Sequence, residues 1–373
     1  MNVAQIGYVA VAVTAVGSAL SVATTKAFGQ APPSALVNQE TREVLEAARA
    51  TSPQTAESTY AYFQDDAEQF LAIATERVWD PTQPYPEPPR TPWGDPSLGG
   101  YWSFASYTPL ERPDALAGKP LYSLQDAIEL FQRQVRADAS FDPAEVHYDW
   151  AEFGLDNWQT PIRPNRRTSL IVDPPDGKLP ALTPEGLERF RAQEPRDTLE
   201  SRGLAERCIA GNDGPPNTPF TQNTAHSRII QTQDYVLLIT EENSDVRIFP
   251  LNDSAHLPAS IRKWLGDSRA HWEGDTLVVE TTNFHEERKW KGAAGNLHLV
   301  ERFTRVADDS LLYEATVTDP TTWVAPWTME LPVPRMDIER LYEFACHEHN
   351  YGIINVVRGA QQRAAEYEAQ LGN

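Results

Sequence analysis

The feature that most constrains the fold is a series of short segments, beginning at residue 227, in which apolar and polar residues alternate. Nine segments of this kind are separated by tight turns rich in Asn, Asp, Gly and Ser. This pattern is typical of consecutive antiparallel strands connected as a meander. The predicted strands are 227–231, 235–240, 246–251, 270–272, 276–283, 297–306, 311–317, 328–333 and 341–347.

Two earlier segments, 101–106 and 168–172, also have strand character. With them the chain has enough strands to close a barrel, and closure removes the exposed edges that an open sheet presents. We therefore predict a mainly β fold in which an antiparallel meander closes into a barrel. A two-sheet sandwich is the alternative.

The residues before this β region follow a different pattern. Uncharged apolar and small residues run from Ile6 to Ala23, and small residues recur between Ala27 and Ala31. This pattern predicts a secretory signal peptide that is cleaved between Ala27 and Ala31. The alternative is an uncleaved membrane anchor, because a run of this length can just span a bilayer.

Helical periodicity and a proline-dense stretch complete the predicted organisation. Apolar residues recur with helical spacing in 41–50 and 57–79, whereas the stretch PTQPYPEPPRTP is too rich in proline for a helix or a sheet. The predicted parts are a signal peptide (1–31), a helical appendage (32–80), a Pro-rich linker (81–97), a β-barrel domain with helical insertions (98–360) and a C-terminal tail (361–373). The insertions are 124–135, with Ser123 as N-cap, and 183–191, which begins with Thr183 and Pro184.

Charge and cysteine content exclude several classes of function. The chain has 32 Lys and Arg against 53 Asp and Glu, a net charge of -21, so we expect no nucleic-acid partner. No segment after the signal is long and apolar enough for a stable membrane span, and we expect a periplasmic or secreted protein.

Two cysteines cannot form a four-cysteine zinc site. In an oxidising compartment Cys208 and Cys346 are expected to form a disulfide, with two separate buried thiols as the alternative.

Several longer stretches carry a family resemblance. They are Arg167–Gly177 (RTSLIVDPPDG), Trp264–Arg269 (WLGDSR), Trp272–Phe284 (WEGDTLVVETTNF), Leu297–Arg305 (LHLVERFTR) and Phe344–Tyr351 (FACHEHNY). Together they resemble a family of uncharacterised, exported bacterial proteins over roughly residues 98–360. The family pattern has Gly at the position of His349. The resemblance implies relatedness and export, and it implies no particular reaction.

The sequence Gly100-x-Trp102 at the first predicted strand is similar to a motif of lipocalin and calycin barrels. In those proteins the Trp closes the floor of the barrel. The resemblance implies that the predicted barrel is lipocalin- or calycin-like and that its partner is a small molecule. We expect Trp102, Trp323, Trp327 and Tyr342 to bind that molecule.

Two predicted strands, 276–283 and 297–306, place ionisable residues beside apolar ones. Because side chains at i and i+2 share a face, His298 and Arg302 lie on one face and Glu301 on the other. His298 is a candidate acid or base, Arg302 a candidate clamp for an oxyanion or carboxylate, and Glu280 the partner that orients the histidine. The alternative is structural: Arg302 pairs with Glu280 across the sheet, and His298 caps a strand end.

The last predicted strand, 341–347, offers a second candidate site. Glu343 and His347 share one of its faces, and a bond through Cys346 would fix the direction of His347 as an acid or base. The alternative is an exposed cluster of solvated residues. His347 and His349 also have the spacing of a two-imidazole metal pair. The Gly of the family pattern at position 349 argues against a shared metal site, so we predict no metal and no organic cofactor.

The predicted function is therefore that of an exported enzyme with cofactor-independent acid/base chemistry. Its substrate would be a small, partly apolar or aromatic molecule in the barrel lumen, and an elimination, hydration, isomerisation or hydrolysis would suit the residues. One alternative is a lipocalin-like carrier that binds a hydrophobic ligand without changing it. Another is an envelope interaction protein that docks through residues 35–92. The pattern does not predict an oligomeric state.

Overall fold

The structure, a computed structural model, describes residues 67–81, 87–139, 162–191, 198–336 and 341–371. Residues 69, 73, 76–77, 213, 219–224, 253, 289, 294 and 349 within these ranges are not described. Residues 60–373 form one compact unit, to which the following description refers. The predicted signal peptide, most of the predicted helical appendage and His349 therefore lie outside the described residues.

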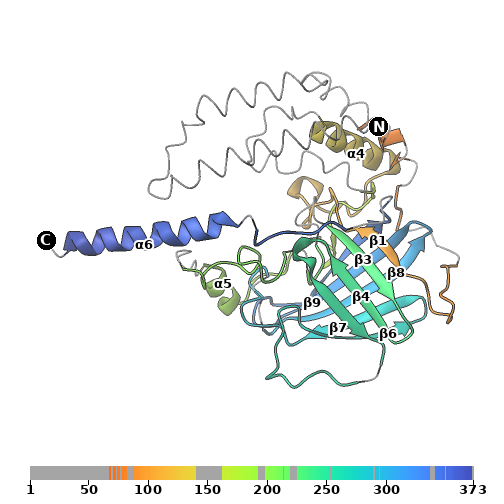
Figure 1. The fold of residues 1–373 in the computed structure, drawn as a ribbon. Coiled ribbons are helices and arrows are strands. Elements are labelled where there is room, and N and C mark those ends of the chain that lie inside the picture. The colour runs from red at the N-terminus through yellow and green to blue at the C-terminus, as the bar shows by residue number, and fades with distance from the viewer. Residues whose placement is uncertain are drawn as a thin grey trace, which may run out of the picture. The chain divides into compact units, whose positions relative to one another are not determined.

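The described chain is mainly β, as predicted, and its strands form two antiparallel sheets (Figure 1). The first sheet has the order β1 (Gly100–Ser103), β3 (His226–Gln231), β4 (Tyr235–Thr240) and β5 (Val246–Pro250). The second has the order β2 (Ile171–Asp173), β10 (Trp327–Pro334), β9 (Ser310–Thr318), β8 (His298–Ala307), β7 (Thr276–Thr282) and β6 (Asp267–Glu273). Within both sheets most neighbouring strands are consecutive in the chain, which is the meander that the turn spacing predicts.

The two sheets approach each other at both edges. At one edge Trp102 on β1 forms an isolated antiparallel bridge with Arg335 just after β10, and the amide of Met336 donates a hydrogen bond of 2.9 Å to the carbonyl oxygen of Tyr101. At the other edge β5 lies beside β6, but among the described residues no ladder pairs these two strands. The described strands therefore form two linked sheets, and the predicted continuous barrel ladder is interrupted between β5 and β6.

The hydrophobic core lies between the facing sides of the two sheets. Buried and half-buried residues alternate along β8 and β9, as expected for strands with one face against a core. Phe249 of the first sheet and Phe303 of the second have ring centroids 6.4 Å apart, and Phe303 lies 5.1 Å from Tyr313. Aromatic and aliphatic side chains from both sheets thus fill the space in which a ligand-holding lumen was expected.

The two predicted helical insertions are present. Helix α4 (Leu124–Asp138) begins at Ser123, whose hydroxyl accepts a hydrogen bond of 3.0 Å from the amide of Asp126. Helix α5 (Pro184–Arg191) follows Thr183, whose hydroxyl accepts 2.9 Å from the amide of Gly186. Both caps satisfy an amide that a helix start leaves without an intrahelical partner. Short 3-10 turns occupy Asp114–Leu116 and Glu242–Ser244.

The C-terminal region differs from the prediction in two respects. Residues 341–347 are not a strand, although their apolar residues alternate, because they join no described sheet. Residues 351–371 form helix α6 (Tyr351–Leu371), so the predicted boundary between a barrel domain and a tail at residue 361 falls inside one helix. This segment is rich in Ala, Gln and Glu, which favour helix over strand.

The predicted disulfide between Cys208 and Cys346 is confirmed, with Cα atoms 5.7 Å apart. It connects residues 341–350 to a loop, 204–218, that we call the closing loop because Asn217 in it reaches the interior between the sheets. Asn350 strengthens this connection, since its side-chain amide donates 2.6 Å to the carbonyl oxygen of Glu206. Among the described helices, none has the length and apolar character that a membrane crossing requires.

Candidate functional site

The predicted pair of Glu280 on β7 and His298 on β8 is formed. Oε1 of Glu280 lies 2.7 Å from Nε2 of His298, and this hydrogen bond lowers the pKa of Glu280 against the opposing effect of burial. However, the side chains of His298 and Glu280 are 38% and 49% exposed. The pair therefore lies on the solvent side of the sheet, and the expectation that it faces an enclosed lumen is wrong.

Arg302, the predicted oxyanion clamp, lies on the same outer face and is engaged elsewhere. Its guanidinium is 2.9 Å from the carboxylate of Glu273. The structural alternative, in which Arg302 pairs with Glu280, is not what the structure contains either. Arg302 is therefore separate from the His298–Glu280 pair, and the three predicted residues do not form one cluster.

A histidine without a predicted role extends the outer pair into a row. His256, in the loop after β5, has Nε2 at 3.6 Å from Oε2 of Glu280 and Nδ1 at 3.2 Å from Oδ2 of Asp267. We call Asp267, His256, Glu280 and His298 the outer row. Burial alone would raise the pKa of Asp267, but hydrogen bonds from the Leu257 amide and from the Lys263 and His256 side chains outweigh it and lower the pKa to about 2.

The second predicted site, at the C-terminal segment, is not assembled on a strand. Glu343 and His347 are both exposed and belong to an irregular segment, so the argument that they share a strand face does not apply. Tyr342, a predicted ligand-binding residue, is 61% exposed, and its amide donates 3.2 Å to the carboxylate of Glu241. The segment therefore fits the alternative, an exposed cluster of solvated residues, better than it fits a preorganised acid/base site.

The three predicted ligand-binding tryptophans are core residues. Trp102 is fully buried; its indole N–H donates 3.0 Å to the carbonyl oxygen of Leu98, and the Arg305 guanidinium lies 5.4 Å from the centre of its ring. Trp323 and Trp327 are also buried, with ring centroids 5.7 Å apart. Their contacts are those of core packing.

A set of buried polar residues that the sequence analysis did not select lies between the sheets. We call it the inner network. Arg247 of β5 donates two parallel hydrogen bonds to the carboxyl group of Glu301 on β8, of which the one from Nη1 measures 2.9 Å. The Tyr313 hydroxyl on β9 donates 2.8 Å to the same carboxyl group. Burial and the proximity of Glu301 raise the pKa of Tyr313 well above its usual range, so its hydroxyl stays neutral.

The inner network continues to the closing loop and to the edge strand β6. The Tyr313 hydroxyl accepts 2.9 Å from the amide of Asn217 in the closing loop. Nη2 of Arg247 donates 3.2 Å to the hydroxyl of Thr281, which in turn is 2.9 Å from the hydroxyl of Ser268. The network therefore connects both sheets and the closing loop through hydrogen bonds that are shielded from water, where they are electrostatically stronger.

Left-handed backbone conformations occur near this network, as they also do at Asn283 and Lys291. Cys208, Asn243 and Ser244 have φ values of 55°, 58° and 52°, which L-residues other than Asn and Asp rarely adopt. Asn243 and Ser244 belong to the loop between β4 and β5, and that loop contacts the segment after Cys208, because Oδ2 of Asp245 accepts 2.8 Å from the amide of Gly211. Such conformations persist only where the surroundings enforce them, and they occur preferentially at functional sites.

The pKa of the Asp245 carboxyl group is raised above its ordinary value. Burial raises its pKa, although hydrogen bonds from Gly211 and Asn243 and the positive charge of Arg288 act against this shift. The guanidinium of Arg247, two residues later, is not the ionic partner of Asp245, because Arg247 pairs with Glu301.

A pocket of about 460 Å³ lies where β5 faces β6, and Asp245 and Arg247 line it. Its apolar lining residues are Ile209, Val246, Ile248, Trp264 and Leu265, and its further polar lining residues are Lys263, Asp267, Ser268 and Arg269. Nε of Arg247 is buried and has no hydrogen-bond partner in the part of the chain that the structure describes. A buried donor without an acceptor is costly, so this N–H is an unsatisfied polar group beside the pocket. We call this space the seam pocket.

Among the described residues, no group of three or more His, Cys, Asp or Glu side chains is arranged to hold an ion. The outer row is a chain of pairwise contacts and not a convergent set. His349, the second member of the predicted imidazole pair, lies outside the described residues.

The comparisons with known proteins are sparse. No protein-family model matches the chain, and no curated protein does. Two crystal structures of the fluorescent protein UnaG, a mutant and the wild type, have TM-scores of 0.21 and 0.19, with 16% sequence identity over 36% of this chain and 88% of theirs. Similarity at this level carries no argument, so the functional proposal depends on the geometry described above.

Proposed function

We propose that the chain is an exported enzyme that performs acid/base chemistry, without an organic cofactor, on a small and partly apolar molecule bound in the seam pocket. One observation carries the proposal. A carboxyl group whose pKa is raised by burial, Asp245, lines the same pocket as Arg247, a buried guanidinium with an unpartnered N–H. A perturbed titratable group beside a fixed cation, in one concave site with both apolar and polar lining residues, is a combination that favours catalysis.

The two groups would have different roles. Asp245 would transfer a proton to or from the substrate, because a raised pKa brings a carboxyl group closer to neutral pH. The Nε–H of Arg247 would donate to the substrate oxygen on which negative charge develops. Glu301 holds the guanidinium from the opposite side through two hydrogen bonds, so the donor does not need to reorganise during the reaction. Elimination, hydration, isomerisation and hydrolysis all use this pair of roles.

The fold and location belong to the same proposal. We infer a lipocalin- or calycin-like barrel with an open seam, which is supported by the Trp102–Arg335 bridge at one sheet edge and the proximity of β5 to β6 at the other. We infer export to the periplasm or beyond from the apolar run at residues 6–23, and the Cys208–Cys346 bond supports an oxidising compartment. Membership in the family of exported bacterial proteins remains a proposal based on the quoted stretches.

A proton-exchange assay tests the chemistry without knowledge of the natural substrate. Purified protein is incubated in D₂O with 4-phenyl-2-butanone, methyl phenylacetate and cinnamate, and mass spectrometry detects deuterium incorporation and new products. The wild type is expected to accelerate exchange or conversion of at least one probe. Asp245→Asn, which preserves shape and can still accept from Gly211, is expected to lower the rate by about 100-fold or more.

The matched control is His298→Ala, which removes the predicted base on the outer face and is expected to keep the wild-type rate. Loss of activity in His298→Ala but not in Asp245→Asn would indicate that the reaction takes place at the outer row. That outcome would contradict the proposal. Probes that bind to the wild type and are recovered without deuterium or conversion would establish the carrier alternative instead. Thermal melting of both variants verifies that each is folded.

A further inference from the structure

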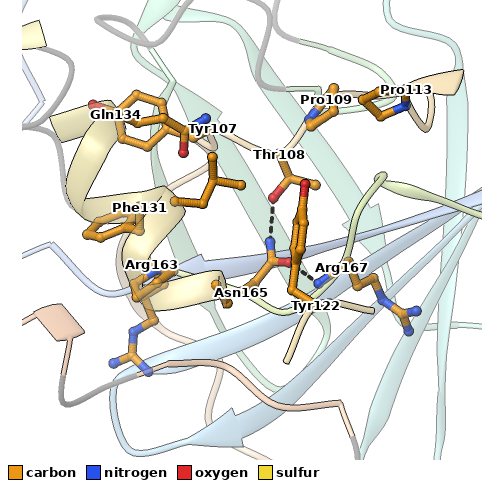
Figure 2. Close-up of a pocket in the computed structure, with 13 residues that line it drawn as sticks. Tyr107, Thr108, Pro109, Pro113, Tyr122, Phe131, Gln134, Arg163, Asn165 and Arg167 are labelled. Atoms are coloured by element: carbon orange, nitrogen blue, oxygen red, sulfur yellow. Dashed lines mark hydrogen bonds between the residues drawn. The ribbon is translucent and has the colours of Figure 1, made fainter. Parts of the chain in front are cut away.

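A second pocket, of about 310 Å³, lies between helix α4 and the segments 107–113 and 163–167 (Figure 2). It shares no lining residue with the seam pocket. Nothing in the proposed acid/base chemistry uses it, so it needs an explanation of its own. We call it the α4 pocket.

The α4 pocket has aromatic walls on two sides. Tyr107 and Phe131 form one wall, with ring centroids 5.9 Å apart and an edge-to-face angle of 67°. Figure 2 shows the ring of Tyr122 on the other side, next to the hydrogen-bonded pair of Thr108 and Asn165. Aromatic faces and edges arranged in this way favour a flat ring in stacked or edge-to-face contact.

The charges at the rim of the α4 pocket are neutralised and directed outward. Arg163 forms an ion pair with Asp309, and Arg167 forms one with Glu330. In Figure 2 both guanidinium groups point away from the aromatic side chains. A ligand carboxylate would therefore lose its hydration without gaining a cationic partner, which is unfavourable. The pocket chemistry selects against charged ligands.

Uncharged hydrogen-bonding groups remain on the lining. The side-chain amide of Asn165 is fixed, because it donates 2.8 Å to Thr108 and its oxygen accepts 2.7 Å from the amide of Arg167. The Tyr122 hydroxyl and the Gln134 amide, by contrast, have no hydrogen bond within the part of the chain that the structure describes. Burial raises the pKa of Tyr122, with the charge of Lys119 acting against it, so this hydroxyl is a neutral donor and acceptor.

We propose that the α4 pocket is a binding site for a small, uncharged aromatic compound with a hydroxyl or amide substituent. The ring lies between Tyr122 and the Tyr107–Phe131 wall, and the substituent exchanges hydrogen bonds with Tyr122 and Gln134. The volume of the pocket is at the lower end of the range for small-molecule sites, which restricts the ligand to one ring or two fused rings. This proposal is independent of the chemistry at the seam pocket.

Benzamide and benzoate test the proposal directly, because they have nearly the same shape and differ in charge. Ligand-observed NMR titrations with the full chain are expected to show saturable binding of benzamide and at least 10-fold weaker binding of benzoate. Tyr122→Phe keeps the ring and removes the hydroxyl, and Gln134→Leu keeps the approximate volume and removes the amide. Each is expected to weaken benzamide binding several-fold. Gln125→Leu, at an exposed position of the same helix, is the matched control and should leave binding unchanged.

Three outcomes would overturn the proposal. They are the absence of saturable benzamide binding, equal affinity for benzamide and benzoate, and benzamide binding that Tyr122→Phe and Gln134→Leu both leave intact. If competition shows that benzamide occupies the seam pocket, Asp245→Asn will alter its affinity while the α4 variants will not. That result rejects this site and leaves the proposed function to its own test.

Discussion

The two faces of β7 and β8 carry the same kinds of ionisable residue in opposite physical states. On the inner face Glu301 is fully buried and is hydrogen-bonded by Arg247 and Tyr313. On the outer face Glu280 and His298 pair at 2.7 Å while remaining partly exposed to water. A short distance between two ionisable groups therefore says little about their contribution to stability. That contribution depends on how far the groups are exposed to solvent.

The reason is the cost of removing a charge from water. An exposed pair keeps most of its hydration whether or not the partner is present, so its contribution to stability is small. A buried pair has lost its hydration, and each member then depends on the other. Substitutions on the two faces are expected to separate these cases.

The largest effect is expected for Glu301→Ala. It leaves the Arg247 guanidinium buried without its acceptor and should lower the free energy of unfolding by about 3 to 5 kcal/mol, measured by urea denaturation. The double replacement Arg247→Met with Glu301→Leu should recover most of that loss, because no charge remains buried. If Glu301→Ala lowers the free energy of unfolding no more than Glu280→Ala on the outer face does, the distinction between the two faces is wrong.

Asp267 provides an intermediate case, because it belongs to the outer row yet its side chain is only 1% exposed. Its pKa is about 2 in the folded protein against an ordinary value of 3.8. A carboxyl group with a lowered folded pKa stabilises the protein above pH 3.8, and this contribution is lost as the pH falls from 3.8 towards 2. The loss should amount to about 2 kcal/mol.

The measurement is the free energy of unfolding between pH 5 and pH 2 for the wild type and Asp267→Asn. The variant should be less stable at pH 5, and its stability should fall less steeply over this interval. Parallel curves for the two proteins would show that the hydrogen bonds from Leu257, Lys263 and His256 do not hold the carboxylate as the structure indicates.

The smallest effect is expected for His298→Ala on the outer face. Half-exposed ion pairs contribute little, so the free energy of unfolding should change by less than about 1 kcal/mol, with the wild type and variant measured side by side in urea. A loss comparable to that of Glu301→Ala would mean that the outer row is a structural element in its own right.

Alternation along the strands was sufficient to predict most of the β structure. The segment Tyr235–Thr240 is a strand with the predicted limits, and the other internal strands differ from their predictions mainly at the ends. The segment 341–347 shows where the same reasoning fails. Its Tyr342 and Phe344 alternate with polar residues but are exposed, so the alternation there does not record a buried face.

The candidate site was harder to predict. The alternation of side chains along a strand separates its two faces without showing which face is internal. His298 and Arg302 were placed on one face and Glu301 on the other, and the grouping was right. One signal pointed to the inner face: Glu301 shares it with Leu299 and Phe303, the larger apolar residues. The pairing of Glu301 with Arg247, 54 residues earlier, depends on how the two sheets meet, and local periodicity contains no information about that.

The position of the Cys208–Cys346 bond has a consequence for biosynthesis. Cys346 follows every strand of both sheets in the chain, so the bond cannot form until all of them have been synthesised. Until then the closing loop is held only by noncovalent contacts, such as the hydrogen bond of Asn217 to Tyr313. A thiol-reactive label would therefore modify Cys208 in incomplete chains and spare it in chains whose bond has formed. The oxidised bond thus marks chains in which the last strand has already been made.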